Sequence, residues 1–287
     1  MRFAAPLAVS LAFVASTALA DEQTISFQVD GQSVVGTLSL PDGAPAPVVV
    51  MFHGFTGSRD ELPVTNTEEG VFSRTARLLR EQGIASLRID FRDSGESDGA
   101  YEFTTFERQV EDGIAALATL AADPRVQGDR IGVIGWSQGG LVATAVAGRS
   151  DAADVVALWA AVADPEATYG GLLGADSITA GLAVQDEALQ VTLPWGAVIG
   201  LRRGFFEGVT TFDPIAEIAS YSGPLFVAQG SRDETVNPAS ADALIGAHEG
   251  PEELWTADMD HVFNAFAGPE TLDAMVAATA TYLQAHL

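Results

Sequence analysis

The sequence contains no cysteine and no lysine. Without cysteine the chain has no disulfide to form, no thiolate nucleophile and no cysteine ligands for a metal. Every basic residue is an arginine, and 14 of these against 39 acidic residues give a formal net charge of −25. A surface this acidic repels nucleic acid and anionic lipid, so we expect neither as a partner.

Long apolar runs are also scarce, and the one at the N-terminus has the form of a signal peptide. Arg2 precedes an apolar run over residues 3–14, and an Ala-x-Ala sequence ends at Ala20. A charged start, a short apolar core and small residues before the cleavage point are typical of export signals. The alternative is an uncleaved anchor helix, for which the run is short. We expect residues 1–20 to be removed, leaving an exported protein, periplasmic or extracellular, with no stable membrane anchor.

A strand, a sharp turn and a helix follow one another between residues 130 and 148. Residues 131–134 form a short apolar run, the motif Gly135-x-Ser137-x-Gly139 comes next, and residues 141–147 are small and apolar. This order is the signature of a nucleophile elbow, in which glycines relieve crowding between the strand and the helix. The helix N-terminus behind Ser137 favours developing negative charge. Ser137 is therefore the candidate nucleophile.

A second Gly-x-Ser-x-Gly match occurs at residues 95–99. No helix follows Ser97, and its neighbours Glu96 and Asp98 carry charges that oppose an oxyanion. We interpret this segment as a turn-rich loop after a strand, because a short motif without its structural context is weak evidence.

The rest of the chain alternates strands with helices. A hairpin at residues 24–29 and 34–40 precedes predicted strands at 48–52, 84–91, 130–135, 155–160, 224–229 and 252–256, with helices at 68–82, 104–122, 213–219, 238–247 and 269–285. This pattern predicts one α/β domain over residues 21–287, built on a mostly parallel, doubly wound sheet. Between residues 164 and about 211 the periodicity is lost, which indicates a cap inserted after the sixth strand.

A serine nucleophile needs a base and an acid that orients it. Among the four histidines, His261 follows the last strand in a loop, and Asp233 closes the strand before it. Each residue alone has an ordinary explanation, such as a surface ion pair or a helix cap. Together, Ser137, Asp233 and His261 lie in the order that the α/β-hydrolase arrangement requires, each after a late strand. This triad needs no metal and no cofactor.

A tetrahedral intermediate also needs hydrogen-bond donors. One is the backbone N–H of Gln138, directly after the nucleophile. The other is expected in the loop after the first central strand, where Phe55 follows Gly54. In this arrangement His53 anchors the loop and does not act as the base.

Several motifs resemble those of bacterial cinnamoyl (feruloyl) esterases in the α/β-hydrolase superfamily, over nearly the whole mature chain. They are His53-Gly54-Phe55-Thr56-Gly57, Asp90-Phe91-Arg92 with the segment 94–99, Gly135-x-Ser137-Gln138-Gly139-Gly140 and Asp260-His261-Val262-Phe263. Related serine aminopeptidase-like sequences share them. The resemblance implies the same triad, an oxyanion hole at Phe55 and Gln138, and a cap that binds an aromatic acid. The chain departs from the family at Asp93, where Gly is usual, and at Trp136, where His is common.

We therefore expect a secreted serine esterase of short-chain or aromatic carboxylic esters, with a small molecule as its substrate. The cap is rich in apolar residues, among which Trp195, Phe205 and Phe206 are candidates for substrate binding, and Tyr169 for binding a ring hydroxyl. Alternatively, these side chains only seal the cap onto the sheet.

Two other functions stay open. An amidase or aminopeptidase could use the same triad, with Asp176, Asp186 or Glu187 of the cap holding the substrate's amine. A catalytically silent binding protein is the second alternative. A thiol-dependent dienelactone hydrolase is excluded by the lack of cysteine, and a dehalogenase by the serine at position 137.

Overall fold

The structure is a computed structural model that describes residues 22–43 and 45–287. The predicted signal peptide, residues 1–20, lies outside the described residues. Within the described ranges, no helix is long and apolar enough to cross a membrane.

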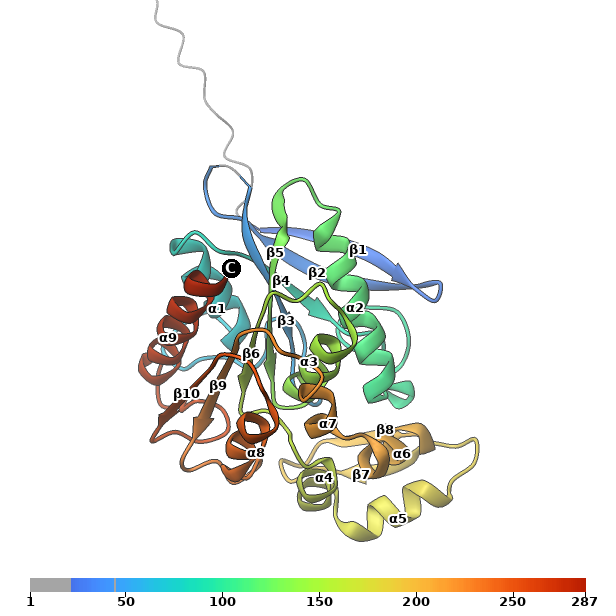
Figure 1. The fold of residues 1–287 in the computed structure, drawn as a ribbon. Coiled ribbons are helices and arrows are strands. Elements are labelled where there is room, and N and C mark those ends of the chain that lie inside the picture. Colours follow the sequence, from blue (N-terminus) through green and yellow to red (C-terminus); the bar gives the residue numbers. More distant parts are fainter. Residues whose placement is uncertain (1–21, 44) are drawn as a thin grey trace, which may run out of the picture.

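The core is an eight-stranded sheet in which six neighbouring strands run parallel and a two-stranded hairpin is added at one edge (Figure 1). A hairpin of β1 (Glu22–Val29) and β2 (Gln32–Ser39) turns at Asp30 and Gly31, both with positive φ. It joins the sheet through an antiparallel pairing of β2 with β4 (Ala85–Asp90). The parallel strands continue from β4 in the order β3 (Ala46–Phe52), β5 (Val126–Trp136), β6 (Val155–Trp159), β9 (Leu225–Gly230) and β10 (Glu252–Ala257). The doubly wound sheet expected from the sequence is present.

Helices cover both faces of this sheet (Figure 1). On β3, Val48, Val50 and Phe52 pack on the face of α2 and α3, whereas Val49 and Met51 pack on the face of α1 and α9. Strands buried on both faces need such continuous apolar runs, which explains the sequence of the central strands. The helices of the core are α1 (Val71–Glu81), the short 3₁₀ turn η1 (Tyr101–Phe103), α2 (Phe106–Ala121), α3 (Gln138–Arg149), α7 (Pro214–Ile218), α8 (Ala239–Ala247) and α9 (Glu270–His286).

The segment between β6 and α7 forms the cap, at the bottom of Figure 1. It consists of α4 (Pro165–Leu173), α5 (Ala175–Ala183), an antiparallel hairpin of β7 (Leu189–Thr192) and β8 (Val198–Leu201), and α6 (Arg203–Thr211). Asp164 starts α4 by accepting a hydrogen bond from the Ala167 N–H at 2.9 Å. Because each element spans only four to nine residues, no long periodic pattern marked them in the sequence.

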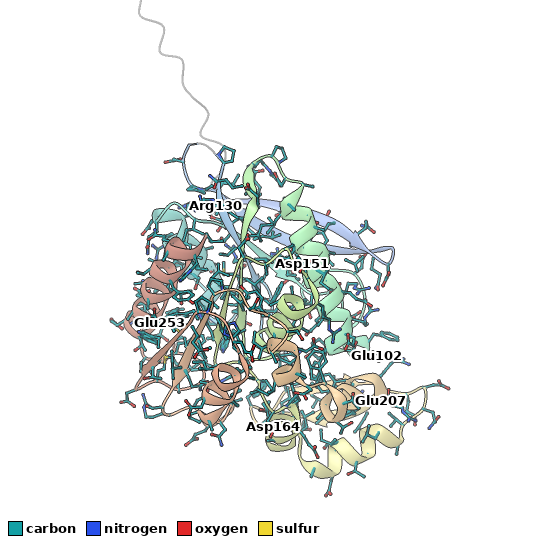
Figure 2. The ribbon with its side chains drawn as sticks, in the orientation of Figure 1. Glu102, Arg130, Asp151, Asp164, Glu207 and Glu253 are labelled. Carbon is teal, nitrogen blue, oxygen red and sulfur yellow. The ribbon has the colours of Figure 1, made fainter. Side chains whose placement is uncertain are left out.

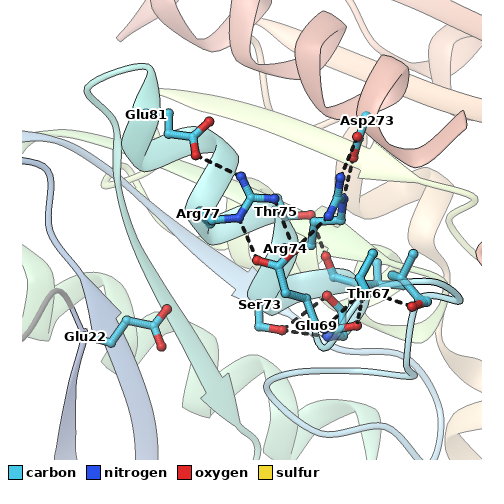
Figure 3. A network of polar contacts seen from close by, with 12 residues as sticks. Glu22, Thr67, Glu69, Ser73, Arg74, Thr75, Arg77, Glu81 and Asp273 are labelled. Atoms are coloured by element: carbon cyan, nitrogen blue, oxygen red, sulfur yellow. Dashed lines mark hydrogen bonds and ion pairs between the residues drawn. The ribbon is translucent and has the colours of Figure 1, made fainter. Parts of the chain in front are cut away.

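Acidic side chains occur on both the core and the cap. Figure 2 labels examples on different sides of the molecule, on the core at Asp151 and Glu253 and on the cap at Glu207. Many are paired with the arginines. In the network of Figure 3, Arg74 of α1 contacts Asp273 of α9 at 2.6 Å and Glu69 at 2.8 Å, so it ties together the two helices on one face of the sheet.

One ion pair is fully buried and joins the end of β4 to α2. Arg92 Nε donates to Asp112 Oδ1 at 2.5 Å, and the Arg92 N–H donates to Asp112 Oδ2 at 2.7 Å. Both side chains are 0 % exposed. Burial raises the pKa of Asp112 to about 6, even though the arginine opposes this shift. The charged pair is retained because each partner satisfies the other out of reach of water.

We predict that Asp112→Ala lowers the free energy of unfolding by about 3–5 kcal/mol, because it leaves the Arg92 guanidinium buried without its main partner. Urea unfolding followed by circular dichroism measures this change. The matched control is Glu111→Ala, which removes another carboxylate from Arg92 but one whose side chain is 53 % exposed. It should cost less than about 1 kcal/mol, and equal losses in the two variants would contradict the assignment.

Candidate active site

Ser137 lies at the sharp turn between β5 and α3 and has a strained backbone, with φ of 56° and ψ of −115°. For a residue with a side chain, such a conformation costs on the order of 1–3 kcal/mol and persists only when its surroundings enforce it. Here the Ser137 N–H donates to the Trp159 carbonyl at 2.9 Å, and the Ser137 carbonyl accepts from Gly140 at 3.0 Å. The turn therefore fixes the hydroxyl at the carboxyl end of the sheet.

The glycines around Ser137 are required by close backbone contacts. A Cβ on Gly139 would lie 2.0 Å from the Phe52 carbonyl oxygen of β3. One on Gly135 would lie 2.3 Å from the Gly139 carbonyl oxygen. No side chain fits in either place, which is the physical reason for the motif seen in the sequence.

Hydrogen bonds connect the three candidate residues of the triad. The Ser137 hydroxyl lies 3.0 Å from His261 Nε2, and His261 Nδ1 lies 2.8 Å from Asp233 Oδ2. Asp233 is buried, and its other oxygen accepts the N–H groups of Thr235 and Val236 at 2.9 and 2.8 Å. With its Nδ1–H donated to the carboxylate, the imidazole presents an unprotonated Nε2 to the serine, as a general base must.

Other polar and aromatic residues of the sequence motifs make structural hydrogen bonds and are not part of the triad. Asp260 accepts the N–H groups of Val262 and Asn264 at 3.1 and 2.8 Å and so shapes the loop that carries His261. Trp136, one of the departures from the resembled family, donates its indole N–H to the His261 carbonyl at 3.2 Å. Ser97 donates to the Asp90 carbonyl at 2.6 Å, so the second motif is a loop, as the sequence indicates.

The loop after β3 exposes one backbone donor between two that are occupied. The Gly54 N–H donates to Glu61 Oε1 at 2.5 Å, and the Thr56 N–H donates to the Tyr101 hydroxyl at 3.1 Å. Within the described residues, the N–H groups of Phe55 and Gln138 have no acceptor. These two free donors are the ones that the sequence analysis assigns to the oxyanion hole.

His53 anchors this loop from below, as expected. It is buried, and its ring contacts the Gly54 carbonyl at 2.9 Å through Nδ1 and accepts the Phe91 N–H at 3.3 Å through Nε2. Burial lowers the pKa of His53, so the ring stays neutral in this position. Both ring nitrogens contact backbone groups, so His53 is not a competing base.

An open cavity of about 620 Å³ borders Ser137 and His261. Its walls come from the loop after β3, the cap and the loop before α9. Among them are four aromatic side chains, Phe55, Trp136, Trp195 and Phe266, of which the last two are 58 % and 62 % exposed. Phe266 was missed in the sequence, although its position five residues after His261 on the same loop was a usable signal. The remaining lining residues are Gly54, Thr56, Gly57, Ser58, Glu61, Leu62, Leu172, Thr235 and Val262.

Three of the four predicted substrate-binding residues do not line this cavity. Phe205 and Phe206 are 1 % and 0 % exposed. Phe205 stacks on Phe55 with ring centroids 5.5 Å apart, and Phe206 lies against Gly181 of α5. The prediction that they bind substrate is wrong for both, because their rings are buried where the cap packs onto the core. Only Trp195 is on the wall.

Tyr169 is also buried, at 1 % exposed, and its predicted contact with a substrate hydroxyl needs correction. Its own hydroxyl donates to Gln138 Oε1 at 2.5 Å. The Gln138 amide in turn donates to Gln109 Oε1 at 2.8 Å, and Gln109 donates to Thr104 at 3.2 Å. This chain of buried polar groups joins the cap to α3 and α2 directly beside the nucleophile.

A second, more polar cavity of about 980 Å³ lies between the cap and α8. It shares Thr235 with the first cavity and includes Asp233 in its wall. Four further acidic residues line it, namely Asp164, Glu166, Asp213 and Glu234. In the part of the chain that the structure describes, no group of three or more His, Asp or Glu side chains is arranged to hold a metal ion.

Residues 30–195, more than half of the chain, match the family described as X-Pro dipeptidyl-peptidase (S15 family). The chain belongs to this S15 family. Among the curated proteins similar to it is the thiohydrolase aneE of Aspergillus aculeatus, 32 % identical over 120 residues that make up 42 % of this chain and 35 % of the relative. The matched segment thus spans about a third of that relative's length.

Solved structures are similar to this S15-family chain over more than nine tenths of its length. Est1E from Butyrivibrio proteoclasticus, with ferulic acid bound, superposes with a TM-score of 0.74 at 21 % identity, covering 91 % of this chain and 98 % of that one. The α/β hydrolase GrgF from Penicillium sp. sh18 gives 0.74 at 18 % identity, covering 92 % and 98 %. These likenesses establish the α/β-hydrolase fold.

Glu61 is an acid on the wall of the cavity beside Ser137, and no motif in the sequence singles it out. It follows the loop after β3 and has a positive φ of 62°. A Cβ on Gly57 would lie 2.5 Å from Glu61 Oε1, so the loop is wrapped closely round the carboxyl group. Burial is the main cause that raises the pKa of Glu61 to about 8, against hydrogen bonds from Gly54 and Leu62 that lower it.

We predict that the melting temperature of the protein depends on pH through Glu61. The folded state holds this proton more tightly than the unfolded chain, in which the pKa is near 4.5. Its contribution to stability is therefore complete below about pH 4.5 and is lost as the pH rises through about 8. Glu61→Gln is neutral throughout, so its melting temperature should fall less than that of the wild type between pH 5 and 8.5. Parallel curves from scanning calorimetry would contradict the raised pKa.

Proposed function

We propose that the protein is an exported serine esterase that hydrolyses carboxylic esters through an acyl-enzyme on Ser137. The observation that carries this proposal is the hydrogen-bonded series Ser137, His261 and Asp233 beside two free backbone donors. A nucleophile, its base, the group that orients the base and donors for an oxyanion are the parts that acyl transfer requires. A silent binding protein has no need of all four, nor of a strained serine.

Each part has a defined step in this proposal. His261 Nε2 takes the proton as Ser137 Oγ attacks the ester carbonyl, and Asp233 stabilises the resulting imidazolium. The N–H groups of Phe55 and Gln138 donate to the oxyanion of the tetrahedral intermediate. His261 then gives its proton to the departing alcohol, and a water molecule repeats the sequence to release the acid.

The cavity supports a short-chain or aromatic acyl group as the substrate. Its aromatic lining, from Phe55, Trp195 and Phe266, offers flat apolar surfaces next to the serine. Burying apolar substrate area contributes about 25 cal/mol per Å². Est1E, which shares the fold, binds ferulic acid, and a cinnamoyl or feruloyl ester is the aromatic substrate that we propose for this chain.

A peptidase or amidase on the same triad is the second candidate, favoured by the S15 family match. The cap acids Asp176, Asp186 and Glu187 do not line either cavity, so they do not support amine binding. The acidic lining of the larger cavity does support it, because carboxylates such as Glu166 and Glu234 attract a cationic group.

Export is part of the proposal and rests on the sequence of residues 1–20 alone. The mature protein would have a small-molecule ester as its partner and would lack a membrane anchor. N-terminal sequencing of protein recovered from the periplasm or the medium tests this, and a chain that begins at Asp21 is the expected product.

We predict that Ser137→Ala lowers kcat for ester hydrolysis by on the order of a millionfold, as loss of a triad nucleophile does. The variant should also lose labelling by a fluorophosphonate probe, which reacts with activated serines. The control is Ser97→Ala in the other motif, which should keep both labelling and turnover within a few-fold of the wild type. Loss of labelling in Ser97→Ala with retention in Ser137→Ala would overturn the assignment.

We predict faster turnover of an aryl-acrylate ester than of a simple acetate, because burial of the ring in the aromatic cavity stabilises the transition state. Methyl ferulate, p-nitrophenyl acetate and alanyl-p-nitroanilide are compared by kcat/KM on the mature protein. Hydrolysis of acetate without measurable hydrolysis of ferulate would leave a general esterase. An anilide rate that rivals the ester rates would favour the peptidase.

A further inference from the structure

In the loop after β3, the free Phe55 N–H lies between two neighbouring N–H groups that are hydrogen-bonded. Before it, the Gly54 N–H donates to Glu61 Oε1 at 2.5 Å, and after it, the Thr56 N–H donates to the Tyr101 hydroxyl at 3.1 Å. The loop closes with a bond from the Gly57 N–H to the Gly54 carbonyl at 3.1 Å. The direction of the Phe55 N–H therefore depends on the group that holds Gly54.

The Glu61 carboxyl group packs against Gly54 and Gly57 of this loop. A Cβ built on Gly54 would lie 3.5 Å from Glu61 Oε1 and also 3.5 Å from Ser137 Cβ. On the other side, both carboxyl oxygens lie within 2.8 Å of the place where a Gly57 Cβ would be. Glu61 also lines the same cavity as Ser137 and His261. Nothing in the acyl-transfer steps above uses this acid.

We propose that Glu61 is a positioning residue, which accepts the Gly54 N–H and thereby aims the Phe55 N–H at the substrate's oxyanion. This inference rests on the proposed esterase function. A neutral carbonyl oxygen of the acid accepts the Gly54 N–H without adding charge. An ionised carboxylate would place a negative charge one residue away from the donor of a developing negative charge, and in a low-dielectric site like charges oppose each other strongly.

The charged and titratable groups around Glu61 do not supply a compensating cation. His53, at the end of β3, has its pKa lowered by burial, and Tyr101, from η1, has its pKa raised by burial, so both are neutral. Arg59 on the same loop is committed to Asp90 of β4 and to Glu96. His261 faces the cavity from the loop before α9 and is occupied by the triad contacts. Burial without a cation is why the pKa of Glu61 lies near 8.

The test is the pH profile of kcat/KM, which reports ionisations of the free enzyme. With p-nitrophenyl acetate, the wild type should lose activity above about pH 8 and keep about a tenth of its maximum at pH 9, as for one proton on a group with this pKa. Glu61→Gln keeps an amide oxygen for the Gly54 N–H and cannot ionise. Its profile should lack this alkaline decline. A wild-type profile that stays flat to pH 10, or a decline that persists in Glu61→Gln, overturns the proposal.

Two further variants separate positioning from general effects of charge. Asp60→Asn removes a neighbouring carboxylate that is 53 % exposed and pairs with Arg88 outside the cavity, and it should keep the alkaline decline. Glu61→Ala removes the acceptor and should lower kcat tenfold or more with little change in KM, since the oxyanion forms only after binding. Loss of the decline in Asp60→Asn, or an unchanged kcat in Glu61→Ala, contradicts the inference. Fluorophosphonate labelling of Ser137 at pH 7 is scored separately, so that failure of the esterase proposal itself is recognised.

Discussion

The close packing of the first turn of α3 against the carboxyl ends of β3 and β5 is the constraint on which the rest of this structure depends. Gly139 lies against the Phe52 carbonyl, and Ser137, two residues earlier in the same turn, has a strained backbone with a positive φ. The unfavourable φ is sustained by a core in which the central strands are buried on both faces. Packing of the sheet therefore maintains a strained backbone conformation at Ser137, which an isolated turn would not keep.

The architecture and the triad could be predicted because their signals are local and repeated. Apolar runs identify strands that are buried on both faces, and the carboxyl ends of parallel strands share one edge. Residues that follow β5, β9 and β10 must then lie near one another, and the structure brings Ser137, Asp233 and His261 within hydrogen-bonding distance. Even the departure at Asp93 is consistent with this logic, since its φ of 72° is one that glycine adopts more easily.

The cap and the finer features of the site could not be predicted in the same way. An apolar side chain in a short helix can face a cavity or the core, and only the tertiary packing decides between them. The side chains of Phe205 and Phe206 are buried in the core, whereas that of Trp195 is exposed on the wall of the cavity. The protonation of Glu61 depends on a loop that encloses it from residues 54 to 57, and no sequence pattern expresses that enclosure.

The buried hydrogen bond between Tyr169 and Gln138 has a consequence for how a ligand reaches the serine. Tyr169 belongs to the cap, and Gln138 is the first residue of the helix behind the nucleophile. If α4 swung away like a hinged lid, this bond would break and the rings of Phe106 and Phe205 would be exposed to water. The broken hydrogen bond and the exposed rings both raise the free energy of the open form, so the cap is held closed in the resting protein. A ligand can still reach Ser137 without separation of the cap from the core, because the cavity beside the serine is open and has the exposed rings of Trp195 and Phe266 on its wall.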